Sequence, residues 1–245
     1  SNFADMVKTA IQEKADIIFS GAGLPLNLPS FLTEGCRTKL APIVSSARAA
    51  KLLCEKWLAN YGYIPDAIVV EGPKAGGHLG YKADQIEDEH YSLEEILPPI
   101  VEEVHAFEAA HDCHIPVIAG GGSNCTETSL MKPFEAQFGH DIPVFVAGGV
   151  YTGEDIYNIL QLGAEGVQMG TRFVATEECD ADPAFKESYV HARKEDIEII
   201  QSPVGMPGRA IHSSFLEKVK AGLKRPKSCP FNCIKTCDVT HSPYC

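Results

Sequence analysis

Short apolar runs alternate along this chain with longer segments in which apolar residues recur at helical spacing. The short runs, rich in β-branched residues, predict strands at residues 16–20, 40–45, 67–71, 116–119, 143–147 and 166–169. Nearly continuous apolar character is typical of strands buried on both faces of a parallel sheet. Helical spacing begins at Phe3 and recurs at about residues 47–60, 92–110, 153–162 and 183–194. Strands that alternate with helices predict an α/β fold.

Small residues follow directly after most of the predicted strands. At the carboxyl ends of parallel strands, such residues let a ligand approach the backbone closely. We therefore expect a ligand site at that edge of the sheet. The residues concerned are Gly21, Gly23, Ser45, Ser46, Gly72, Gly120, Gly121, Gly122, Gly148, Gly149, Gly170 and Thr171.

One segment of the chain occurs twice. Residues 107–122 contain Phe-Glu-Ala, Ile-Pro-Val and Gly-Gly in that order, and residues 134–149 repeat the pattern. A solenoid needs at least three stacked repeats. We interpret the pair as a local duplication of one helix–strand–glycine unit over residues 107–149.

Charge and hydropathy exclude several kinds of partner. The 245 residues include 21 lysines and arginines against 33 aspartates and glutamates, a net charge of −12. Nucleic acid is therefore not expected as a main partner, because phosphate binding relies on a basic surface. No run approaches the roughly 18 apolar residues of a membrane span, and the first residues do not form a signal peptide. The sequence predicts a cytoplasmic protein with no membrane partner.

Cysteines gather at the end of the chain. Of the nine cysteines, the last four are Cys229, Cys233, Cys237 and Cys245. Four thiolates can hold zinc or an iron–sulfur cluster, but this spacing is not one of the common ligand patterns. We expect reduced structural thiols here and no metal site, with a metal centre as the alternative.

Residues 71–80 form a glycine-rich loop that follows a predicted buried strand and contains His78. An imidazole exchanges protons near neutral pH at small cost. A solvated histidine in a glycine-rich turn is the alternative interpretation. The position at the carboxyl mouth of a parallel strand favours a functional role.

Two later strand ends predict a phosphate site. Gly148 and Gly149 end one strand just before a helix start, and Gly170 and Thr171 end the next. Backbone N–H groups at such turns suit a phosphate. Small donors at the ends of consecutive strands are similar to the phosphate site formed by the last two strands of a β/α barrel.

The runs at residues 71–80, 147–149, 166–173 and 202–209 together resemble the nitronate monooxygenase family, formerly called 2-nitropropane dioxygenase. The family includes flavin-dependent enoyl-acyl-carrier-protein reductases. The resemblance extends over nearly the whole chain and implies a TIM-barrel-like (β/α)8 fold that binds FMN. By this likeness residues 16–20 form the fourth strand, and three β-α units are expected before Ser1. Residues 1–202 would then be the FMN-binding portion, and residues 203–245 a lid and Cys-rich tail.

The resemblance also implies roles for individual residues. His78 matches the catalytic base, Glu71, Gly76 and Gly77 match the flavin-binding loop, and Gly148 and Gly149 match the phosphate site. The phosphate cradle is completed by Gln168, Met169, Gly170 and Thr171. Two positions depart from the family pattern, because Glu71 stands where glutamine is usual and Lys74 replaces a common glutamate. Gly120, Gly121 and Gly122 form a rival phosphate loop, but Gly148 and Gly149 keep the family spacing to Gln168.

The implied function is an FMN-dependent oxidoreductase that oxidises alkyl nitronates with dioxygen. One alternative is an NAD(P)H-dependent enoyl-acyl-carrier-protein reductase, which would use the same histidine and flavin. A flavin-binding fragment without turnover is the third hypothesis. The expected partner is a small molecule, an alkyl nitronate or an enoyl thioester. A homodimer is also possible, because the sheet edges of an open barrel would pair with one another.

Overall fold

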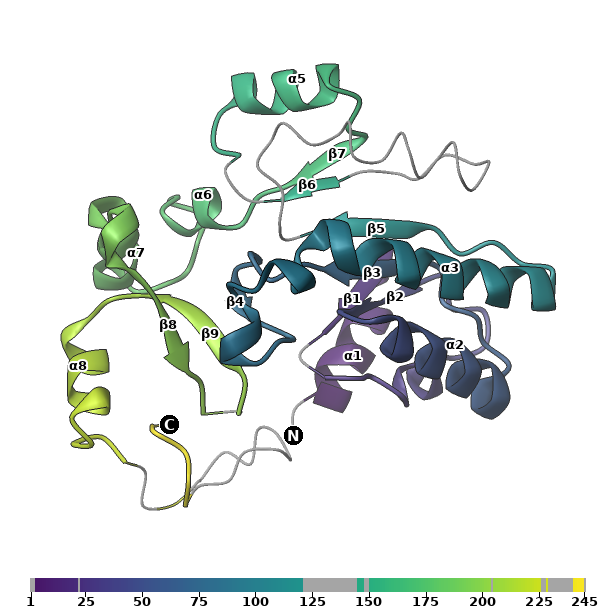
Figure 1. Ribbon diagram of the computed structural model, residues 1–245, viewed down its shortest axis with the longest axis horizontal. Coiled ribbons are helices and arrows are strands. Elements are labelled where there is room, and N and C mark those ends of the chain that lie inside the picture. Colours follow the sequence, from purple (N-terminus) through teal and green to yellow (C-terminus); the bar gives the residue numbers. More distant parts are fainter. Residues whose placement is uncertain are drawn as a thin grey trace.

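The computed structural model describes residues 3–21, 23–120, 145–147, 150–203, 205–225, 228 and 240–244. Helices and strands alternate along the described chain (Figure 1). The elements are α1 (Phe3–Gln12), β1 (Ile17–Ser20), β2 (Lys39–Val44), α2 (Ala47–Tyr61), β3 (Ile68–Glu71), β4 (Gly77–His78), α3 (Leu93–His111), β5 (Val117–Gly120), β6 (Phe145–Ala147), α5 (Gly153–Gln161), β7 (Gly166–Gln168), α6 (Thr171–Val174), α7 (Pro183–His191), β8 (Ile197–Gln201), β9 (Pro207–Ile211) and α8 (Ser214–Lys220).

A four-stranded parallel sheet has the order β1-β2-β3-β5. The strands follow chain order without a reversal, and the connecting helices α2 and α3 lie side by side against the sheet (Figure 1). This progression is that of a β/α barrel rather than of a doubly wound sheet, in which the order reverses. The predicted α/β fold with a parallel sheet is confirmed.

Sequence explains where α2 begins and ends. The hydroxyl of Ser46 accepts the N–H of Ala49 at 3.3 Å, which satisfies one of the free donors of the first turn. Gly62 follows the helix with a φ of 61°, a left-handed conformation that favours glycine. The helix buries Leu53, Cys54 and Trp57 against the sheet and α3.

The main core lies between this sheet and α2 and α3. Its fully buried side chains include Leu40, Leu53, Trp57, Ile68 and Ile100. Trp57 packs with its indole N–H donating to the carbonyl of Pro25 at 3.1 Å, so its one polar group is satisfied.

A second parallel pair, β6 and β7, forms its own small sheet under α5. In Figure 1 this pair lies next to β5, on the side away from β1. Its described buried core consists of Val146, Val150, Ile159 and Ala164. Residues 121–144, which include most of the second copy of the repeated segment (residues 134–149), lie outside the described residues.

The third sheet is antiparallel, with the order β4-β9-β8. Its hairpin of β8 and β9 crosses the boundary that sequence placed between residues 202 and 203. The start of the expected lid is therefore paired with β4, a strand that belongs to the barrel portion. The cysteines of the tail, Cys229, Cys233, Cys237 and Cys245, lie outside the described residues, as does Cys125. None of the described helices is long and apolar enough to cross a bilayer.

Candidate flavin and substrate site

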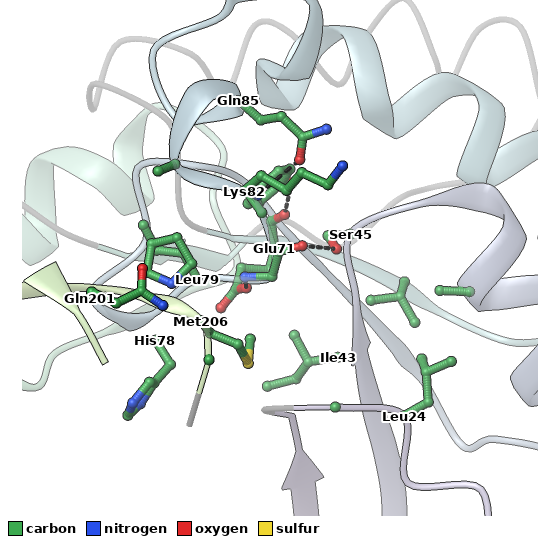
Figure 2. A pocket seen from close by; sticks show the side chains of 18 residues that line it. Leu24, Ile43, Ser45, Glu71, His78, Leu79, Lys82, Gln85, Gln201 and Met206 are labelled. Carbon is green, nitrogen blue, oxygen red and sulfur yellow. Dashed lines mark hydrogen bonds between the residues drawn. The ribbon is translucent and has the colours of Figure 1, made fainter. Parts of the chain in front are cut away.

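The first cavity has a volume of about 640 Å³ and opens beside the carboxyl ends of β2 and β3. Ser45 and Glu71 line it from these strand ends, and His78 lines it from β4 (Figure 2). Gln201, the last residue of β8, and Met206, in the turn that joins β8 to β9, also line it. The parallel sheet and the antiparallel sheet thus both contribute to this cavity.

The position of His78 is fixed by backbone pairing. His78 pairs with Gly208 of β9, and the next N–H, that of Leu79, donates to the carbonyl of Pro207 at 3.0 Å. The guanidinium of Arg209 donates to the carbonyl of Ala75, before β4. Sequence placed His78 in a loop after β3, whereas the structure holds it in a short strand of its own.

Ser202 contacts the imidazole of His78. The two atoms, Nε2 of His78 and Oγ of Ser202, lie 2.7 Å apart, and Ser202 is only 2% exposed. The backbone of Ser202 is held in the β8–β9 turn by N–H donation to the carbonyl of Met206 at 3.1 Å. A buried hydroxyl on one ring nitrogen orients the imidazole. Ser202 belongs to the run at residues 202–209 that carries the family resemblance, but the sequence assigned no role to it.

Glu71 is the last residue of β3 and is half-buried at the cavity wall. Its Oε2 accepts the N–H of Gly80 at 3.1 Å, and its carbonyl accepts the hydroxyl of Tyr81 (Figure 2). Burial raises the pKa of the Glu71 carboxyl above its usual value, while the hydrogen bond from Gly80 partly opposes this. Gly80 must be small, since a Cβ there would lie 2.9 Å from the hydroxyl of Ser45.

A second cavity, of about 390 Å³, lies where four parallel strands end. Its wall includes the final residues of β3, β5, β6 and β7, which are Glu71, Gly120, Ala147 and Gln168. The loop that follows β3 and the residues that follow β7 complete it. These are Lys74, Ala75, Gly76, Gly170 and Thr171.

Gly76 and Gly170 leave this second cavity open. A Cβ at either position would meet no atom of the described residues within 4 Å, so nothing in that part of the chain fills the space in front of either backbone. Exposed backbone N–H groups and the Thr171 hydroxyl are donors of the kind that a phosphate accepts. These residues therefore fit the phosphate end of a flavin mononucleotide.

The structure brings together most of the cofactor residues expected from sequence. Glu71, Gly76, Gln168, Gly170 and Thr171 all line the second cavity. Met169 instead packs against the core under α5, and Gly77 lines neither cavity.

The choice between the two glycine loops falls partly outside the described chain. Gly148, Gly149, Gly121 and Gly122 are not among the described residues. Gly120, from the rival loop, does line the second cavity.

Comparison with known proteins assigns the family. The sequence profile described as nitronate monooxygenase matches residues 1–129 and 126–241, which together cover nearly the whole chain. The chain belongs to the nitronate monooxygenase family. The two matched segments meet between the two copies of the repeated unit.

Relatives within this family are distant and longer. A probable nitronate monooxygenase of Staphylococcus saprophyticus is 24% identical over 217 residues, which are 89% of this chain and 50% of that protein. A second such protein, of Staphylococcus haemolyticus, is also 24% identical, over 89% of this chain and 50% of its own length. The chain thus spans about half the length of the curated nitronate monooxygenases that it matches.

Solved structures agree on the fold. FabK from Thermotoga maritima is 26% identical with a TM-score of 0.52, over 90% of this chain and 54% of that chain. A nitroalkane oxidase from Streptomyces ansochromogenes has a TM-score of 0.51 at 20% identity, over 86% of this chain and 49% of that one. The likeness to these proteins supports the TIM-barrel-like character of the parallel sheets.

Proposed function

We propose that this nitronate monooxygenase family member is an FMN-dependent oxidoreductase that oxidises alkyl nitronates with dioxygen. The observation that carries the proposal is the relation between the two cavities. Glu71 and Ile43 line both cavities, which therefore share part of their wall. His78 lines the first cavity, and the donors suited to a phosphate line the second. An elongated cofactor with a phosphate tail and a reactive ring suits such an arrangement.

The cofactor end of the proposed site is the second cavity. Gly76, Gly170 and Thr171 would hold the phosphate of FMN, with Gln168 beside them. FMN, when bound, supplies the electron-transfer chemistry. Gly148 and Gly149 stay predicted phosphate contacts, because they lie outside the described residues.

The proton-transfer end of the proposed site is His78. Its imidazole would take the proton from the carbon next to the nitro group of a neutral substrate, or stabilise a nitronate that is already ionised. Ser202 would hold the ring in place through Nε2, which leaves Nδ1 for exchange with the substrate. The apolar wall formed by Leu24, Ile43 and Met206 would accept the alkyl chain.

A second candidate is an NAD(P)H-dependent enoyl-acyl-carrier-protein reductase. The likeness to FabK from Thermotoga maritima favours it, and the same flavin site and the same histidine would serve it. The third candidate, a flavin-binding protein without turnover, shares the cofactor site only. A homodimer and a cytoplasmic location stay predictions as well.

Anaerobic reduction of the bound flavin separates these candidates. The released cofactor is first identified by chromatography, where FMN is expected rather than FAD. Bleaching of the flavin absorbance is then followed with ethyl nitronate, NADH and NADPH in turn. Fast bleaching by the nitronate, with oxygen consumption in air, supports the proposal. Bleaching by a nicotinamide nucleotide alone supports the reductase, and a flavin that neither donor bleaches supports the third candidate.

A further inference from the structure

Glu71 occupies the junction between the two cavities. It lines both of them, and it is the one acidic side chain among the described residues that line either. Its backbone is held by pairing of β3 with Gly120 of β5 and by the Tyr81 hydroxyl. The backbone of Glu71 is therefore fixed at the junction, and the N–H of Gly80 holds the carboxyl group there.

Few groups of the described protein stabilise the negative charge of the Glu71 carboxylate. The N–H of Gly80 is the one hydrogen bond found for it within the described chain, and it reaches Oε2 alone. No basic side chain contributes to its titration, which is governed by burial and by that single N–H. When a second negative charge lies near a half-buried carboxylate that has no cation beside it, the pKa of the carboxylate rises and binding of a proton is favoured.

The other charged or titratable groups around the junction are few. His78, Tyr81 and Lys82 line the first cavity with Glu71, and Lys74 lines the second. None of the lysines forms an ion pair with Glu71 in the described structure. Burial, followed by the charge of Glu71, raises the pKa of the Tyr81 phenol, so this group stays protonated near neutral pH.

We propose that Glu71 takes up a proton when the flavin bound along the two cavities is reduced, so that electron and proton uptake are coupled at this residue. The inference rests on the flavin site proposed above. Oxidised flavin has a neutral ring, so Glu71 can remain ionised beside it. Reduction adds negative charge to the ring, which disfavours the Glu71 carboxylate and favours the carboxylic acid.

Electrons and protons balance in this step. The organic donor, an alkyl nitronate or a nicotinamide nucleotide, is oxidised and gives two electrons to the flavin. A reduced flavin held there would carry one added proton and one negative charge. Glu71 binds a second proton from solvent, forming its O–H bond, and so loses its own negative charge. Reoxidation by dioxygen reverses the uptake at Glu71.

The test is a redox titration of the FMN-loaded protein at several pH values. Between the two pKa values of Glu71, in the oxidised and in the reduced protein, two protons accompany two electrons. In this pH range the equilibrium constant for reduction of the wild-type protein should fall 100-fold per pH unit. In Glu71→Gln it should fall only tenfold per pH unit, because glutamine cannot bind the second proton. The difference corresponds to about 30 mV per pH unit for a two-electron couple. The matched control is Glu87→Gln, an exposed glutamate of the adjacent loop that lines neither cavity.

A second measurement counts protons directly. Photoreduction of the wild-type protein and of Glu71→Gln in weakly buffered solution with a pH-indicator dye gives the number of protons per flavin, and the wild type should take up more than the variant within the same pH window. Equal proton counts at every pH, or equal slopes, for the wild type and Glu71→Gln overturn the inference while leaving the flavin site intact. A protein that binds no flavin overturns the proposed function instead, and this inference with it.

Discussion

The two parallel sheets of this molecule both contribute to the proposed cofactor site, and their described residues are packed differently. The β1-β2-β3-β5 sheet lies under two long helices, and side chains such as Leu53, Trp57 and Ile100 have no exposed surface there. The β6-β7 pair lies under α5, and its described buried core has four residues, the largest of them Ile159. In the same region, large side chains remain at the surface: Tyr157 is 62% exposed and Leu162 is 51% exposed.

The contrast bears on cofactor retention, because the proposed phosphate donors Gly170 and Thr171 follow β7 of the small sheet, whereas Gly76 follows β3 of the large one. Glu71 ends a strand of the large sheet, and His78 is paired to a hairpin beside it, so both have firm support. Gln168, Gly170 and Thr171 extend from the small sheet. A ligand that binds only the folded form stabilises it by mass action, and the region with the smaller described core is expected to gain the most. Bound FMN is therefore expected to stabilise the β6-β7 region more than the large sheet.

The largest expected effect is on turnover, from His78→Ala. A general base typically contributes about 10²–10⁴-fold, so turnover of a neutral nitroalkane should fall by that factor while FMN remains bound. The loss should be smaller with a preformed nitronate, which needs no deprotonation. Steady-state oxygen consumption on both substrates is the measurement. The control is His191→Ala, which removes an exposed imidazole of α7, and equal losses on both substrates would remove His78 from the role of base.

Two substitutions that shorten buried side chains test the difference in packing between the large sheet and the β6-β7 pair. The chain has one tryptophan, so Trp57 fluorescence reports unfolding of the large core alone. Leu53→Ala should lower the free energy of unfolding in urea by about 2–5 kcal/mol on this signal, because it leaves a cavity in a fully buried site. Ile159→Ala should shift the same curve by less than about 0.5 kcal/mol and should weaken FMN retention instead. Equal shifts of the Trp57 curve would mean that the two regions unfold as one unit.

The smallest expected effect comes from Ser202→Ala. Loss of one hydrogen bond to the imidazole is worth about 0.5–1.5 kcal/mol, which is roughly a two- to tenfold loss of turnover on a neutral nitroalkane. Flavin content should not change, and Ser202→Thr, which keeps the hydroxyl, should restore part of the rate. A loss as large as that of His78→Ala would show that Ser202 does more than orient the ring.

Sequence predicted the parallel strands well, because each of them lies in an apolar run and small residues follow most of these runs. The predicted run at residues 40–45 is β2 at Lys39–Val44, and the run at 67–71 is β3 at Ile68–Glu71. The antiparallel strands were not predicted. Strand β9 begins with Pro207 and Gly208, which indicate a break, yet proline is tolerated at the first residue of a strand.

The site was predictable where its residues follow strands and unpredictable where it depends on long-range contact. Gln168, Gly170 and Thr171 come at the end of an apolar run, so their place at the carboxyl edge could be expected. Ser202 is 124 residues from His78 in sequence, and only the pairing of β4 with β9 brings the two together. The three isoleucines within the five residues of β8 were the available signal for a strand there.

The central claim is that the two cavities form one FMN site, with the phosphate end at Gly170 and the proton-transfer end at His78. Binding titrations of FMN and of riboflavin, which lacks the phosphate, test it most directly in the wild type, Gly170→Val and His78→Ala. The wild type and His78→Ala should bind FMN more tightly than riboflavin, and Gly170→Val should lose that preference, because its side chain would fill the space in front of the backbone. Equal affinities for the two flavins in the wild type, or an undiminished preference for FMN in Gly170→Val, would contradict the claim.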